Sequence, residues 1–153
     1  MKITVLSVGK KHDPQLAGAI DDYTVRVARQ IKVEWEFIAP SGLAADAARV
    51  EESTRLMARC KQDDTVWLLD EVGVSVTSPE LAQKLEAAQN TSVQRLIIII
   101  GGAFGVDDSV RHRADFVWSL SKLVFPHQLV RLILVEQLYR AYEINRGSGY
   151  HHL

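Results

Sequence analysis

Five consecutive aliphatic residues, from Leu96 to Ile100, constrain the fold of this chain more than any other feature. A strand with no polar residue on either face is typical of the centre of a parallel sheet, because helices cover both faces of such a sheet. Glycines follow this run at Gly101, Gly102 and Gly105. The sequence therefore predicts a buried central strand that ends in a glycine-rich loop.

The rest of the chain alternates between the periodicity of strands and that of helices. Strands are predicted for residues 3–8, 33–37, 66–69, 96–100 and 116–118. Helices are predicted for residues 14–31, 47–60, 78–88 and 127–144, together with a short helix after residue 108. Five strands alternating with five helices predict one α/β domain over residues 1–153, with a mainly parallel sheet flanked by helices.

Two local signals refine this prediction. Glu34 and Glu36 alternate with apolar residues, which places the second strand near a sheet edge. Ser78 stands directly before Pro79 and is expected to cap the helix that begins there, with the proline at its first position.

The composition excludes several classes of protein. The longest uncharged apolar stretch, residues 96–106, is shorter than the ~18 residues that a membrane-spanning helix needs, so a membrane protein is excluded. Cys60 is the only cysteine, so an internal disulfide and a cysteine-based zinc site are excluded, and no metal is expected. The chain starts with a strand pattern rather than a signal peptide, which favours the reducing cytoplasm.

The charges are distributed unevenly along a chain whose net charge is only -1. This small sum argues against a protein that coats nucleic acid indiscriminately. Residues 1–33 and residues 109–153 each carry six basic and three acidic side chains, whereas residues 34–108 carry six basic and thirteen acidic ones. If the two ends meet in the fold, a basic face can form there; an incidental spread of solvated charges is the alternative.

The glycine-rich loop is the first candidate site. Ligands of a parallel sheet bind outside the carboxyl ends of its strands, which here are the loops after Leu69, Ile100 and Leu120. Ile100 stands where a dinucleotide-binding fingerprint has its first glycine, and Asp107 and Asp108 would repel a phosphate from the next helix. A phosphate-free ligand is therefore favoured, and a tight turn that needs glycine for steric reasons is the alternative.

The last third of the chain holds two further clusters. His127 and Arg131 share a helical face at a spacing of four residues, although a local hydrogen bond is the simpler role for His127. Arg140 lies four residues after Glu136, which predicts an ion pair. The end of the chain, around Tyr150, is expected to fray, yet an aromatic ring followed by histidines can also close over a site.

The last predicted helix has almost no polar side over two of its turns. A helix that is apolar all round is buried all round, and in a chain of this size a second subunit covers it most easily. We therefore expect a homodimer that pairs through this helix. The apolar residues are Leu129, Val130, Leu132, Ile133, Leu134 and Val135.

Taken together, these motifs resemble the RlmH family of small bacterial SPOUT methyltransferases. The resemblance spans the whole chain, and it is strong in the last third and looser before Val66. The segments that carry it are Leu69-Asp70, Ile100-Gly101-Gly102 with Gly105, Trp118 to Ser121, Pro126 to Arg131, Glu136 to Ala141, and Tyr150-His151.

This resemblance implies a fold and an activity. The implied fold is an α/β domain with a C-terminal trefoil knot, an exception to the rule that chains avoid knots, in a homodimer whose partner completes each site. The implied reaction transfers a methyl group from S-adenosylmethionine to N3 of a pseudouridine in 23S rRNA of the assembled ribosome. The implied cofactor contacts are Leu69, Gly101, Gly102, Gly105, Ser121, Lys122, Leu123, Val124, Phe125 and Pro126.

The same resemblance suggests roles for the polar residues near the end of the chain. His151 is expected to accept the N3 proton or to orient its acceptor, and Tyr150 to stack on or orient the base. Arg140 completes this catalytic set. His127, Arg131 and His152 are expected to contact RNA, and for His127 and Arg131 the alternative is that they hold the cofactor loop.

Two departures from the family pattern leave rival functions open. Ala103 and Phe104 stand where the family commonly has proline or serine, then often glutamate. His152 and Leu153 replace a lysine or arginine, so RNA binding should weaken as pH rises through histidine titration near about 6.5. The rivals are a related knotted enzyme that methylates another RNA position, such as a tRNA ribose, and a catalytically silent RNA- or ribosome-binding dimer. The terminal Tyr150-His151 argues against the first rival, and cofactor binding would argue against the second.

Overall fold

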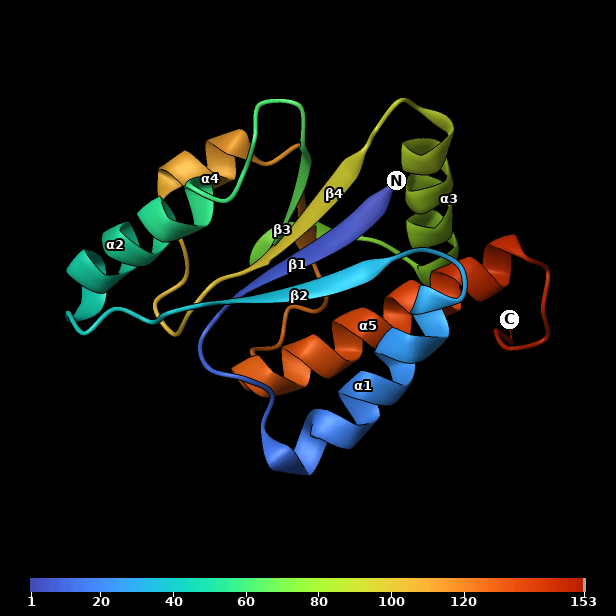
Figure 1. Cartoon of the computed structure of the whole chain (residues 1–153), viewed down its shortest axis with the longest axis horizontal. Coiled ribbons are helices and arrows are strands. Elements are labelled where there is room, and N and C mark those ends of the chain that lie inside the picture. Colours follow the sequence, from blue (N-terminus) through green and yellow to red (C-terminus); the bar gives the residue numbers. More distant parts are fainter. Residues whose placement is uncertain (153) are drawn as a thin grey trace.

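A computed structural model describes residues 1–152 and confirms the predicted order of five strands and five helices (Figure 1). The strands form one sheet in the order β2-β1-β4-β3-β5, and every pair in it is parallel. The central position of β4 and the edge position of β2 are as predicted. The strands are β1 (Lys2–Val8), β2 (Val33–Ile38), β3 (Thr65–Ser75), β4 (Arg95–Ile100) and β5 (Phe116–Ser119).

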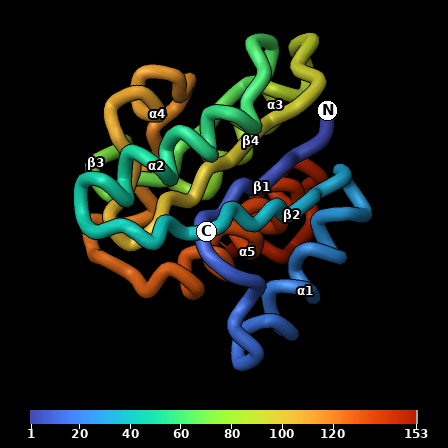
Figure 2. The backbone as a smooth tube through the Cα atoms, turned by 60° about the vertical axis from the view of Figure 1, so that its left-hand side comes forward, coloured from blue at the N-terminus to red at the C-terminus, as the bar shows by residue number. Residues whose placement is uncertain are grey.

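Helices cover both faces of the sheet, as the alternation of strands and helices and the apolar central strand predicted. Figure 2 shows α2 and α4 on one side of the sheet and α1 and α5 on the other. The first and last parts of the chain therefore meet, because α1 packs along α5. The helices are α1 (Pro14–Ala28), α2 (Ala45–Met57), α3 (Ser78–Asn90), α4 (Asp108–Arg113) and α5 (His127–Asn145).

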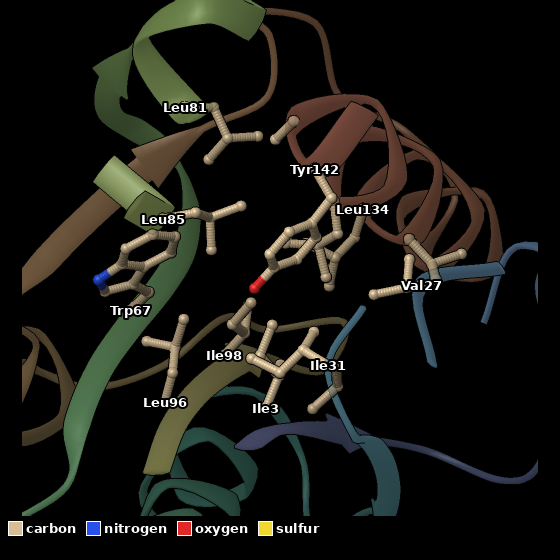
Figure 3. Close-up of a cluster of buried hydrophobic side chains, with 14 of the residues drawn as sticks. Ile3, Val27, Ile31, Trp67, Leu81, Leu85, Leu96, Ile98, Leu134 and Tyr142 are labelled. Atoms are coloured by element: carbon tan, nitrogen blue, oxygen red, sulfur yellow. The ribbon is translucent and has the colours of Figure 1, made fainter. Parts of the chain in front are cut away.

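Two hydrophobic cores explain why β4 is apolar on both faces. Ile98 points into the core under α1, α3 and α5, where it meets Leu134 and Tyr142 (Figure 3). Ile97 and Ile99 point to the opposite side, into the core under α2 and α4. Consecutive side chains of a strand alternate between the two faces of a sheet. Because a core covers each face, all five apolar residues of β4 are buried.

Two local predictions were wrong. Thr77, not Ser78, caps α3: its hydroxyl accepts from Glu80 N–H, and the Glu80 carboxylate accepts from Thr77 N–H. Ser78 instead donates to Gln137 Oε1 on α5. The strand predicted to end at Leu69 continues to Ser75, because β3 pairs with β5 again after a register shift.

The apolar helix α5 is not buried all round within one chain. Leu134 and Val135 are fully buried, but Leu129, Val130, Leu132 and Ile133 are only half-buried. The homodimer and the trefoil knot stay predictions. Residue 153, the last of the predicted domain, lies outside the described residues. Among residues 1–152, no helix is long and apolar enough to cross a membrane.

Candidate active site

A pocket of about 590 Å³ opens at the carboxyl ends of β4 and β5 and beside residues 69–71 in the middle of β3, where sequence analysis placed the ligand. Its volume lies in the range of about 300–1,000 Å³ that is usual for small-molecule sites. The lining residues are 69–71, 100–106, 111, 118, 120, 121, 123–125, 127 and 130. The predicted cofactor contacts Leu69, Gly101, Gly102, Gly105, Ser121, Leu123, Val124 and Phe125 are among them, whereas Lys122 and Pro126 are exposed and do not line the pocket.

The glycines of the loop after β4 are required by its geometry. Gly105 N–H donates to Gly102 O at 3.0 Å and closes a tight turn, in which Gly105 adopts a φ of 72°. A Cβ atom on Gly101 would lie 3.0 Å from Val106 Cγ1. The turn and the ligand site predicted for this loop are thus the same feature, since the turn itself forms part of the pocket wall.

The start of α4, next to the glycine loop, offers no free anion site. Asp107 Oδ1 accepts from Ser109 N–H at 3.0 Å and from Val110 N–H at 3.4 Å. These are the groups that a phosphate would use at a helix N-terminus. The observation supports the prediction of a phosphate-free ligand. Within residues 1–152, no group of three or more His, Cys, Asp or Glu side chains could hold a metal ion.

An ion pair in the pocket wall was missed by sequence analysis. Arg111 Nε and Nη2 donate to Asp70 Oδ2 at 3.2 Å and 3.0 Å, and both residues line the pocket. Arg111 comes from α4 and Asp70 from β3, so no local sequence pattern connects them. The pair adds a carboxylate and a guanidinium to a wall in which Glu71, Ser121 and His127 lie among apolar side chains.

A buried arginine lies behind the pocket at the first turns of α5. Arg131 is fully buried, and its guanidinium donates to Ser7 Oγ at 3.0 Å, Lys10 O at 2.9 Å and His127 Nε2 at 3.3 Å. No carboxylate pairs with it anywhere in residues 1–152. Because a guanidinium only donates, His127 Nε2 must accept. Burial and the charge of Arg131 lower the pKa of His127, which keeps the ring neutral.

This burial corrects the role predicted for Arg131. A guanidinium without any exposed surface cannot reach an RNA phosphate, because Ser7, Lys10 and α5 itself enclose it. The alternative prediction, that Arg131 holds the cofactor segment, agrees with its contact to His127, which lines the pocket. His152 is exposed, and its contact with RNA stays a prediction.

Tyr150 and His151, near the end of the described residues, are held by side-chain contacts, whereas sequence analysis expected this segment to fray or to close over a site. Tyr150 Oη donates to Glu136 Oε1 at 3.1 Å and lies 3.3 Å from Tyr23 Oη. Arg140 forms the predicted pair with Glu136, with Nε and Nη2 at 3.1 Å and 2.7 Å from Oε1. Its third nitrogen, Nη1, lies 3.3 Å from His151 Nδ1. Tyr23 was missed because 127 residues separate it from Tyr150.

Neighbouring groups stabilise the present protonation states of Arg140 and Tyr150. Glu136 raises the pKa of Arg140 through their hydrogen bonds. Burial, followed by the hydrogen bond with Tyr23 and the charge of Glu136, raises the pKa of Tyr150. Tyr150 therefore remains a neutral donor to Glu136.

The structure does not bring the predicted catalytic residues to the predicted cofactor residues within one chain. The pocket lies beside the first turn of α5, at His127. The tail, which holds Tyr150 and His151, packs on the second half of α5, at Glu136 and Arg140. His127 and Glu136 are nine residues apart, which is about 13.5 Å along a helix axis. One chain by itself thus holds two separate parts of the predicted site.

Comparisons with known proteins agree on one family. A family model described as "Predicted SPOUT methyltransferase" matches residues 1–151. The protein named ribosomal RNA large subunit methyltransferase H from Geobacter metallireducens is 44% identical over 153 residues, with 99% of each chain covered. Its namesake from Geobacter sulfurreducens is 42% identical, with 99% of this chain and 100% of that protein covered.

One solved structure supports the fold alone. The crystal structure of tRNA (m1G37) methyltransferase from Aquifex aeolicus superposes with a TM-score of 0.57 at 16% identity. The match covers 92% of this chain and 70% of that one. At this identity the likeness concerns the course of the chain and carries no information on the substrate.

Proposed function

This chain belongs to the SPOUT methyltransferase family, and from that membership we propose that it methylates N3 of a pseudouridine in 23S rRNA of the assembled ribosome, with S-adenosylmethionine as methyl donor. The names of its relatives support an rRNA substrate. The observation that carries the proposal is the pocket of the glycine loop and residues 118–130, which suits a small ligand without phosphate. The work of such an enzyme is in the cytoplasm, where ribosomes assemble.

The pocket residues fit this cofactor. Apolar side chains such as Leu69 and Trp118 and the exposed main chain of the glycine loop suit a flat adenine ring. Asp70 and Arg111 provide an acceptor and a donor for the polar groups of the cofactor. When bound, S-adenosylmethionine supplies a methyl group on a sulfonium, which needs no activation. The chain's own task is therefore alignment and control of the N3 proton.

A second subunit brings the two parts of the site together. In a two-fold dimer with its axis perpendicular to α5, the two helices run antiparallel, so the second half of one lies beside the first half of the other. The half-buried residues Leu132 and Ile133, near the middle of α5, form the apolar contact. The tail of one protomer then reaches the cofactor pocket of its partner.

In this arrangement His151 acts as a hydrogen-bond donor. Arg140 occupies His151 Nδ1, so the neutral ring keeps its proton on Nε2. Loss of the N3 proton to water spreads negative charge onto the neighbouring carbonyl oxygens of the pseudouridine, and the Nε2–H of His151 stabilises that charge. We therefore propose a donor role for His151, whereas sequence analysis expected it to accept the N3 proton or to orient its acceptor. Tyr150, held by Glu136 and Tyr23, orients the base.

The experiment is methyl transfer from labelled S-adenosylmethionine to 70S ribosomes from cells that lack this modification, followed by mapping of the label. We expect label on N3 of a 23S pseudouridine and a shallow dependence on salt, since a chain of net charge -1 makes few phosphate contacts. Label on naked tRNA, or cofactor binding without any transfer, would overturn the proposal.

A further inference from the structure

Glu52 is a buried carboxylate with no role in the site described so far. It lies on α2, on the opposite face of the sheet from α5, and is only 4% exposed. Its Oε2 accepts from Ser41 N–H at 3.0 Å. Its Oε1 has no hydrogen-bond partner, and no Lys or Arg pairs with Glu52 within residues 1–152. A buried carboxylate oxygen without a donor is costly, so such a group is retained for a reason other than stability.

The unpaired oxygen, Glu52 Oε1, faces the glycine loop on the side away from the pocket. A Cβ atom on Gly102 would lie 2.6 Å from Glu52 Oε1 and 3.1 Å from Val8 Cγ1. Gly102 has no positive φ, so the backbone conformation does not require a glycine there; a side chain would instead require the Glu52 carboxylate and Val8 to shift. The loop at Gly102 thus lies close to the Glu52 carboxylate, with no room for a side chain between them.

The neighbouring residue of α2 holds the other end of the same loop. Ser53 Oγ accepts from Asp107 N–H at 2.9 Å, and Ser53 is fully buried. The glycine loop, residues 101–107, therefore has a contact with α2 near each of its ends. Residues 101–106 line the pocket with their other side, so α2 supports the pocket wall without lining the pocket itself.

We propose that Glu52 is a positioning residue for cofactor binding. Its free carboxylate oxygen fixes the glycine loop at Gly102. Once the cofactor is bound, the same oxygen accepts a main-chain N–H of the turn at residues 102–104. This inference rests on the proposed function, because it assigns the cofactor of that same pocket. The oxygen without a donor is then the acceptor for the ligand-bound form of the loop, and the pocket closes from behind.

The test is isothermal titration of S-adenosylmethionine into the full chain and its variants. Glu52→Gln keeps the size of the side chain but replaces one acceptor by an NH2 donor, so it cannot accept both Ser41 N–H and the loop. We expect its Kd to rise about tenfold, which corresponds to about 1.4 kcal/mol. The matched control is Glu51→Gln, whose carboxylate pairs with Arg55 on α2, and its Kd should stay within about twofold of the parent.

A double-mutant cycle separates positioning from a general structural role. Gly102→Ala should weaken binding, because its methyl group meets the carboxylate. Adding Glu52→Ala makes room for that methyl group, so the double variant should bind more tightly than Gly102→Ala alone. Amide hydrogen exchange of residues 102–104 should slow on ligand binding in the parent and not in Glu52→Gln.

Three results decide between the two proposals. If the parent binds S-adenosylmethionine and Glu52→Gln binds equally well, Glu52 does not position the loop. Additive effects of Gly102→Ala and Glu52→Ala, with only the unfolding midpoint lowered, would show a structural residue and overturn the inference. A parent that does not bind S-adenosylmethionine refutes the proposed function first, and this assignment of Glu52 falls with it.

Discussion

Arg131 and Arg140 lie nine residues apart on the same helix and have opposite surroundings. Arg131 is fully buried, pairs with no carboxylate in the described chain and donates to a hydroxyl, a carbonyl and an imidazole. Arg140 is half-buried and donates to Glu136 and His151. The first arginine joins β1 and α5 at the base of the pocket, and the second holds the tail. In the proposed site, the first half of α5 therefore lies beside the cofactor pocket, and the second half holds the tail with the proposed catalytic residues.

The largest effect is expected when one chain carries a defect in the cofactor pocket and the other chain carries a defect in the tail. Gly102→Ala should weaken cofactor binding, and His151→Ala should remove a group proposed to contact the substrate, so each homodimer should lose most of its methyl transfer at a cofactor concentration that saturates only the parent. Subunit exchange in an equal mixture should restore about a quarter of the parent activity, since half of the dimers are mixed and each has one intact site. Methyl transfer to ribosomes before and after mixing measures this; no recovery would show that each site lies within one chain.

The second prediction exchanges the two arginines for methionine. Arg131→Met leaves Ser7, Lys10 O and His127 without their buried donor and should lower the free energy of unfolding by about 3 kcal/mol. Arg140→Met breaks a partly exposed pair and should cost less than about 1 kcal/mol. Methyl transfer should fall about 100-fold in Arg140→Met, because His151 loses its partner. Urea unfolding and turnover of both variants give the comparison, and equal stability losses would contradict it.

The donor role of His151 gives a third prediction. His151→Gln retains an N–H donor of similar reach, whereas His151→Ala retains none. We expect His151→Ala to lose about 100-fold in kcat and His151→Gln about tenfold. Cofactor affinity should stay unchanged in both variants. Equal losses would point to a proton acceptor, and full activity of His151→Ala would remove the residue from the mechanism.

A smaller effect is expected at Tyr23, which supports the tail from α1. Tyr23→Phe removes the hydroxyl 3.3 Å from Tyr150 Oη but keeps the ring that packs near Tyr139. Loss of one neutral hydrogen bond of about 1 kcal/mol should lower kcat about fivefold without changing cofactor affinity. A change of the cofactor Kd instead of kcat would show that the two halves of α5 are not independent.

The smallest effect concerns pH. Burial and then the charge of Arg131 lower the pKa of both His12 and His127, so the unfolded chain takes up protons at a higher pH than the folded one does. Stability should therefore be constant above about 6.5 and fall as pH decreases below that value toward the lowered pKa values. Urea midpoints between pH 7.5 and 5.5 measure the slope, which His127→Gln should reduce. A midpoint that rises on acidification would contradict the neutral state of these rings.

Much of the fold follows from periodicity that is local in the sequence. The run from Leu96 to Ile100 predicted a central strand because both of its faces lack polar groups, and Glu34 and Glu36 predicted an edge strand. The prediction failed where a neighbouring element decides. Thr77 rather than Ser78 caps α3, and the hydroxyl of Ser78 donates to Gln137 on α5 instead. The extension of β3 beyond Leu69 depends on its pairing with β5.

The candidate site divides in the same way. The glycine loop, the Glu136 and Arg140 pair and the motif around Tyr150 are short in sequence and were predicted from their spacing or from the family they resemble. Asp70 with Arg111, Tyr150 with Tyr23, and Gly102 with Glu52 join residues that are 41, 127 and 50 positions apart.

By itself, then, the sequence determined the order and type of the elements, the buried central strand and the loops that carry the chemistry, because hydrophobic periodicity and steric demands act over a few residues. Only the tertiary structure decided which charges are buried and what they contact. Arg131 at i+4 from His127 has the spacing of an ordinary surface pair, yet β1, the loop that follows it and α5 enclose it. Burial is a property of the packed elements together, and no single segment encodes it.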